Sequence, residues 1–180
     1  MRFPHEHLLL TTVLILSASG YVSGAQPNAA KVKMVDVKGQ EVGEATLTEL
    51  SDGVLIRLNL AGKPPLISPG SHALHIHEVG KCEQTFKSAG GHFNPLGKKH
   101  GYLDPQGKHL GDLPNIHVPD SGILTVEIFA PQITLTAGKT SLLDADGSSL
   151  VIHAAVDDYR TDPAGNSGDR IACGVIEKAS

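Results

Sequence analysis

Short runs of alternating apolar and polar residues constrain the fold of this chain more than any other feature. In the run 54–60, Val54, Ile56 and Leu58 fall on one face of a strand while Arg57 and Asn59 fall on the other. A slip of the same alternation between Met34 and Val35 predicts a β-bulge. Further strands are expected at 32–37, 45–50, 73–78, 124–128, 150–154 and 171–176.

Turn residues such as Asp52-Gly53 and Asp146-Gly147 separate these runs, and no window of eleven or more residues has the period of a long amphipathic helix. The pattern predicts an all-β domain, a sandwich or flattened barrel of about eight antiparallel strands. Two long stretches, 79–114 and 156–170, fit no strand. Because their composition is not that of a linker, we expect them to be functional loops.

The N-terminus has the composition of a secretory signal peptide. Arg2 precedes an apolar run from Leu8 to Leu16, and small residues ending at Ala25 offer a cleavage site. The run is too short to span a bilayer, and an uncleaved membrane anchor is the alternative. We therefore expect residues 1–25 to be removed, and residues 26–180 to form one domain in the periplasm or outside the cell, with no membrane attachment.

Charge and cysteine content limit the possible partners and the redox environment. The net charge is −4, and no basic cluster is dense enough to indicate a nucleic-acid partner. Cys82 and Cys173 are the only cysteines. In an exported protein an even number of cysteines favours a disulfide, and two buried thiols are the alternative.

Histidine is concentrated in the middle of the chain, where eight of ten lie between His72 and His153. His75 and His77 are two residues apart on an expected strand, so both rings face one side and could meet one ion. By the same alternation His72 faces the other way, which favours a packed, hydrogen-bonded residue rather than a ligand. His153 ends another strand and by itself would more often be structural.

A second group of possible ligands lies in the first long loop and consists of three histidines and a carboxylate, His92, His100, His109 and Asp112. Such a closed four-ligand set suits tetrahedral zinc. A histidine-rich surface loop that binds no metal is the alternative.

Taken together, the ordered motifs resemble those of the copper–zinc superoxide dismutase family over residues 31–176. The resemblance is carried by the segments Pro69–His77, Gly91–Pro95, Gly111–Asn115 and Gly165–Gly174. It implies a Greek-key sandwich, and a disulfide between Cys82 and Cys173.

The resemblance also implies a paired metal site in which His92 bridges the two ions. The implied copper ligands are His75, His77, His92 and His153, and the implied zinc ligands are His92, His100, His109 and Asp112. Asp157 would hydrogen-bond the outer ring nitrogens of His75 and His100, which fixes their orientation.

The implied activity is conversion of superoxide to dioxygen and hydrogen peroxide, by alternate reduction and oxidation of copper beside a structural zinc. Arg170 occupies the position of the family's active-site arginine and would attract the anionic substrate. On reduction of copper, His92 would take a proton for the peroxide product. Lys81 or Lys87 would add to the positive field that guides superoxide to Arg170.

Three departures from the family pattern accompany the resemblance. Ala73 and Leu74 stand where the family usually has glycine and phenylalanine, Asp169 directly precedes Arg170, and the loop after His153 is short.

Two other functional classes could use the same residues. A metal carrier built on this fold predicts loss of a copper ligand or of the arginine, and a zinc hydrolase needs an open ligand position. The sequence is consistent with a monomer and with a homodimer, because the family pairs its sandwiches through different faces.

Overall fold

The computed structural model describes residues 28–61 and 66–179, so the expected signal peptide lies outside the described residues. The described chain is built from strands, with one short 3-10 helix, η1. The elements are β1 (Ala29–Asp36), β2 (Glu41–Leu50), β3 (Gly53–Leu60), β4 (Gly70–His72), β5 (Leu74–His77), η1 (Gln84–Ala89), β6 (Ile116–Val118), β7 (Leu124–Pro131), β8 (Ser149–His153) and β9 (Arg170–Lys178). Within these residues no helix is long and apolar enough to cross a membrane.

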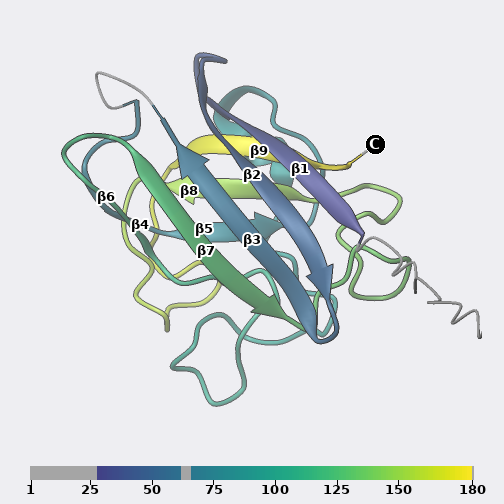
Figure 1. The fold of residues 1–180 in the computed structure, drawn as a ribbon. Helices are drawn as coiled ribbons and strands as arrows, with labels where there is room; N and C mark the ends of the chain where they lie inside the picture. Colours follow the sequence, from purple (N-terminus) through teal and green to yellow (C-terminus); the bar gives the residue numbers. More distant parts are fainter. Residues whose placement is uncertain (1–27, 62–65, 180) are drawn as a thin grey trace, which may run out of the picture.

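Seven strands form one antiparallel sheet in the order β5-β8-β9-β1-β2-β3-β7, and β4 pairs with β6 in a second, small sheet. Figure 1 shows β1, β2, β3 and β7 in front, with β9, β8 and β5 crossing behind them, so the large sheet curls into two layers. Strands β1 to β3 are consecutive neighbours, and β9 returns to lie beside β1, which is a Greek-key order. The predicted all-β sandwich is confirmed.

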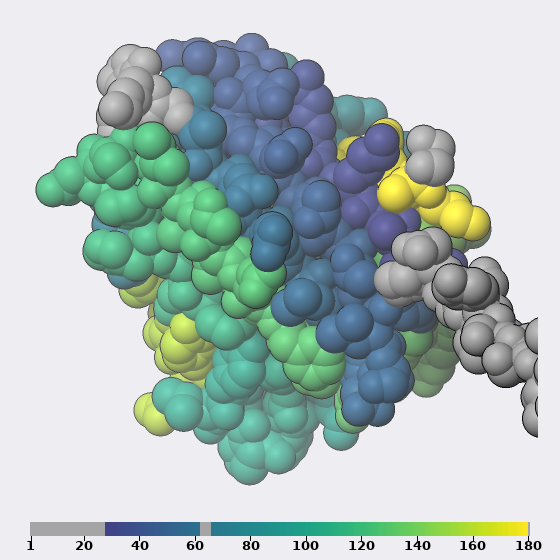
Figure 2. Space-filling model, viewed as in Figure 1, coloured from purple at the N-terminus to yellow at the C-terminus, as the bar shows by residue number. Residues whose placement is uncertain are grey.

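The alternation in the sequence defines the core as expected. Val54, Ile56 and Leu58 of β3 are fully buried, whereas Arg57 between them is exposed. The expected bulge is present, since the pairing of β1 with β2 shifts register between Met34 and Val35. Figure 2 shows the outward-facing side of β1, β2, β3 and β7, which forms the front face of the molecule in this view. Removing one large aliphatic side chain from such a core costs about 2–5 kcal/mol.

The structure contains nine strands among the described residues, and two of them, β4 and β6, lie outside the runs expected from the sequence. Each of these two strands is only three residues long. A run of three residues is too short to display a period of two, so the sequence pattern does not reveal it. This small sheet places His72 of β4 against the core.

Candidate metal centre

Two groups of buried side chains could each hold a metal ion, and one residue belongs to both. Within each group the possible ligand atoms lie within 4.8 Å of one another. The groups are His75, His77, His92 and His153, and His92, His100, His109 and Asp112. These are the two sets that the family resemblance implies, and His92 is the shared residue.

The first group assembles at an edge of the large sheet. His75 and His77 lie on β5, which pairs with β8, and His153 ends β8 where the register shifts. Their ligand atoms belong to one group, which agrees with the two-residue spacing. His72 behaves as interpreted: its Nδ1 lies 2.8 Å from the carbonyl oxygen of His153 and its Nε2 lies 2.8 Å from that of Ser68.

Two loop segments bind the free edge of β5 and bring in the remaining ligands. The N–H of Phe93 donates to the carbonyl of Ile76, and the N–H of Ile76 donates to the carbonyl of Gly111. A side chain at position 111 would collide with that Ile76 carbonyl, so the close approach requires glycine. His92 and Asp112, the neighbours of these two loop residues, are thereby placed beside β5.

The nitrogens of the first group fit a metal ion that imidazole ligands bind. His75 Nδ1 and His92 Nε2 are buried and have no hydrogen-bond partner in the protein. His77 Nε2 and His153 Nε2 lie 3.3 Å apart and face one another. Buried ring nitrogens are normally hydrogen-bonded, so this convergence is best explained by a shared ion, and imidazole suits copper.

The second group converges on one carboxylate oxygen. Asp112 Oδ1 lies 2.8 Å from His92 Nδ1, 3.1 Å from His100 Nδ1 and 3.3 Å from His109 Nδ1. Ligands about 2.0–2.2 Å from a tetrahedral zinc ion are separated by roughly 3.3–3.6 Å, so the spacing is close to that required. The other oxygen, Oδ2, accepts the N–H groups of Gly101 and His109, which fixes the carboxylate.

Asp157 connects the two groups from behind. Its Oδ2 lies 2.8 Å from His75 Nε2 and its Oδ1 lies 2.9 Å from His100 Nε2, and the carboxylate is fully buried. Asn115 holds this residue in turn, since its amide accepts the N–H of Asp157 and donates to the carbonyl of Asp157. The position of Asp157 agrees with the expectation from the sequence, whereas the role of Asn115 was missed. The only signal was its place at the end of the Gly111–Asn115 motif.

Burial favours the neutral form of His77, His92 and His153, which is the form that binds metal. Desolvation lowers the pKa of His77 to about 2 and that of His153 to about 3, and it lowers the pKa of His92 to about 4 although Asp112 acts to raise it. Burial also acts to lower the pKa of His100, but its hydrogen bonds to Asp112 and Asp157 outweigh this and raise it to about 9.

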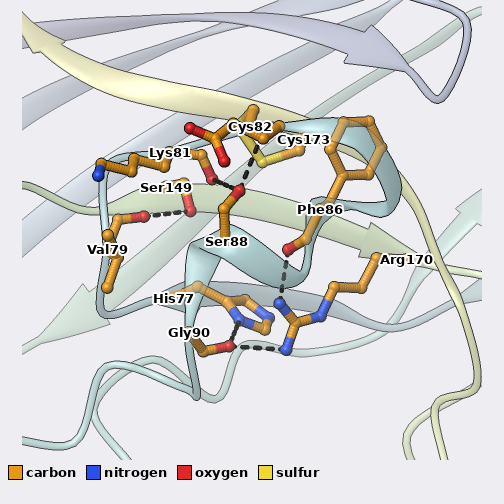
Figure 3. Close-up of a disulfide and its surroundings, with 11 residues drawn as sticks. His77, Val79, Lys81, Cys82, Phe86, Ser88, Gly90, Ser149, Arg170 and Cys173 are labelled. Carbon is orange, nitrogen blue, oxygen red and sulfur yellow. Dashed lines mark hydrogen bonds between the residues drawn. A yellow bond between two sulfur atoms is a disulfide. The ribbon is translucent and has the colours of Figure 1, made fainter.

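Arg170 lies beside the first group and is held by the disulfide-bonded loop (Figure 3). Its Nη1 donates to the carbonyl of Phe86 and its Nη2 to the carbonyl of Gly90, both at 2.6 Å. The expected disulfide between Cys82 and Cys173 joins this loop to β9, the strand that begins at Arg170.

Arg170 lines two openings at the surface. One, of about 360 Å³, is also lined by members of both histidine groups, including His77, His92 and His153. The other, of about 490 Å³, contains Lys87 as well as Asp169. A small anion could therefore approach the first group past the guanidinium.

A Greek-key β-sandwich whose paired metal-ligand groups share a single histidine defines a class of binuclear metalloproteins. Comparison with known proteins narrows this class: residues 41–176 match the model of the copper/zinc superoxide dismutase family. The chain belongs to that family.

Relatives of known name and structure agree with this assignment. A copper–zinc superoxide dismutase of Aquifex aeolicus (strain VF5) is 48% identical, with 94% of this chain and 96% of the relative aligned. One from Caulobacter vibrioides is 46% identical over 77% of this chain and 80% of the relative. The crystal structure of a superoxide dismutase-like protein from Bacillus subtilis has a TM-score of 0.76 at 42% identity, covering 81% of this chain and 96% of that one.

Proposed function

We propose that this chain disproportionates superoxide to dioxygen and hydrogen peroxide, using copper in the first group and zinc in the second. The copper ligands would be His75, His77, His92 and His153, and the zinc ligands His92, His100, His109 and Asp112. One observation carries the proposal. His92 directs Nδ1 to the second group, while its unpartnered Nε2 belongs to the first.

Copper supplies the one-electron exchange when it is bound, whereas zinc has no redox chemistry and orders the loop. Arg170 binds the anion, because a guanidinium donates charge-assisted hydrogen bonds and stays charged. Both Nη atoms are anchored by carbonyls, so the cation is fixed at the opening it shares with His77.

His92 is the proposed proton carrier. Forming hydrogen peroxide from superoxide takes up protons, and Nε2 of His92 is a buried nitrogen without a protein partner on a ring that lines the opening. His92 Nδ1 is directed at the second group, 2.8 Å from Asp112 Oδ1, so a proton held at Nε2 on the other side of the ring is presented toward the substrate.

Lys87 is the lysine whose position supports a guiding role, because it lines the opening of about 490 Å³ together with Arg170. Positive charge beside the path to the site attracts an anion over a distance set by the ionic strength. Raising the salt concentration should slow turnover. A rate indifferent to salt would count against electrostatic guidance.

The two alternative functions fit the residues less well. A metal carrier predicts a missing copper ligand or arginine, yet both complete groups and Arg170 are present. A zinc hydrolase needs an open position and a free base, but Asp112 already contacts all three histidines of its group.

Export to the periplasm or the cell exterior is part of the proposal and is supported by the apolar N-terminal run and by the disulfide. Mass spectrometry of the mature protein would locate the cleavage expected after Ala25. A homodimer stays a prediction, which analytical ultracentrifugation would check.

Metal analysis combined with a superoxide-consumption assay tests the function directly. The purified protein should contain copper and zinc and consume superoxide, and chelation should remove both the metal and the activity. Full activity after complete removal of copper would overturn the proposal.

A further inference from the structure

The loop between β8 and β9 holds His100 at its main chain as well as at its ring. Asp162 Oδ1 accepts a 2.9 Å hydrogen bond from the N–H of His100, while Asp157 Oδ1 lies 2.9 Å from His100 Nε2. The β8–β9 loop therefore contacts both the main-chain N–H and the ring of His100. We propose that Asp162 is a positioning residue for His100, a role that rests on the proposed zinc site.

Further contacts fix the same two loops against each other. The N–H of Leu103 donates to the carbonyl of Tyr159 at 2.9 Å. That carbonyl also lies against Gly101, where a Cβ atom would have no room. The main chain on the C-terminal side of His100 thus follows the β8–β9 loop closely, and Asp162 completes the contact at His100 itself.

Holding the amide limits where the ring can point. The side chain of His100 is fully buried and its Nδ1 lies 3.1 Å from Asp112 Oδ1. A buried ring on a fixed backbone has few accessible rotamers, so Nδ1 stays directed at the second group. Without the bond to Asp162, the backbone of His100 gains freedom that zinc binding must then remove.

The hydrogen bond, rather than the nearby ion pair, is the effective contact. Lys99 Nζ lies 3.2 Å from Asp162 Oδ2, but the two side chains are 55% and 43% exposed, and such pairs contribute little. The amide of His100 is part-buried and its acceptor is charged, which makes a stronger bond. Asparagine at position 162 could still accept this N–H through its side-chain oxygen, whereas alanine could not.

Zinc release from the holoenzyme to a chromogenic chelator tests the role. Loss of contacts that orient metal ligands typically weakens metal binding about 10- to 100-fold, so Asp162→Ala should release zinc faster by about that factor. Asp162→Asn and Lys99→Ala should release zinc close to the wild-type rate. Asp36→Ala is the matched control, because Asp36 accepts two main-chain N–H groups in the β1–β2 turn, outside both ligand groups.

Melting temperatures with and without zinc separate positioning from general stabilisation. A purely structural Asp162 would lower both values equally in Asp162→Ala, whereas a positioning residue reduces the gain in melting temperature that zinc confers. If zinc raised the melting temperature of Asp162→Ala as much as that of the wild type, or if this variant released zinc at the wild-type rate, the role of Asp162 would be overturned. The proposed function would still stand as long as the wild type consumed superoxide. A wild type that binds no zinc would overturn both.

Discussion

The carbonyl oxygen of Gly90 accepts a 2.6 Å hydrogen bond from Nη2 of Arg170 and also lies 3.1 Å from Nδ1 of His77. One peptide group thus orients the proposed substrate-binding cation and a proposed copper ligand together. Gly90 follows η1 in the loop that the disulfide of Cys82 ties to β9 (Figure 3). The geometry of the reaction site depends on this loop.

Replacing Arg170 should slow the reaction without removing the metals. Arg170→Ala should lower kcat/KM by about tenfold or more, within the range of 10–10³ that local charge can contribute to association. Arg170→Lys should recover only part of it, because an ammonium group cannot span the carbonyls of Phe86 and Gly90 as the guanidinium does. Pulse radiolysis at two ionic strengths measures the effect, and equal rates for all three proteins would refute the assignment.

Removing a ligand of the first group alone should separate the two metals. His153→Ala should abolish superoxide consumption while the protein still folds and retains zinc, because His153 belongs only to the first group. His117→Ala is the control: His117 is an exposed histidine of β6, outside both groups, and should behave as wild type. Metal content and activity are measured together. Retained activity in His153→Ala would contradict the role of this ligand.

Changing Asp157 should weaken both sites at once. Asp157→Asn presents one oxygen and one NH₂ group to two rings, so the carboxylate contacts to His75 and His100 cannot both be reproduced. We expect zinc affinity to fall by about 10- to 100-fold, and copper affinity to fall as well. Chelator competition for each metal provides the measurement, and unaltered affinities would show that Asp157 does not orient these ligands.

Acidification should destabilise the metal-free protein. The pKa values of His77, His92 and His153 are lowered to about 2, 4 and 3, chiefly by burial, from an ordinary value near 6.5. Below about pH 6.5 the unfolded chain therefore binds protons that the folded chain does not, and the free energy of unfolding falls by at most about 1.4 kcal/mol per pH unit for each group.

His100 acts in the opposite direction, since its pKa is raised to about 9. Its contribution is fully present below about pH 6.5 and is lost as the pH rises through about 9. With three groups opposing one, the melting temperature of chelator-treated protein should be lower at pH 5 than at pH 7. A melting temperature that rises on acidification would show that burial does not keep these rings neutral.

Local spacing predicted the sheet and two local parts of the candidate metal centre, whereas the shared His92 and the full ligand sets came from the family resemblance. A period of two assigns side chains to faces whatever the rest of the chain does, so the core of β3, the bulge after Met34 and the pairing of His75 with His77 followed from neighbouring residues. The grouping of His92, His100, His109 and Asp112 followed from residue chemistry and order along one loop.

Tertiary structure decided which distant segments meet. Gly90 and Arg170 are 80 residues apart, and His100 and Asp162 are 62 apart, so no local pattern links them. The roles of Asn115 and Asp162, and the short strands β4 and β6, depend on main-chain groups of loops packed against the sheet. Nearly every residue type offers the same main-chain N–H and carbonyl, so the sequence identifies the proposed ligands, whereas only the folded chain determines what holds them in place.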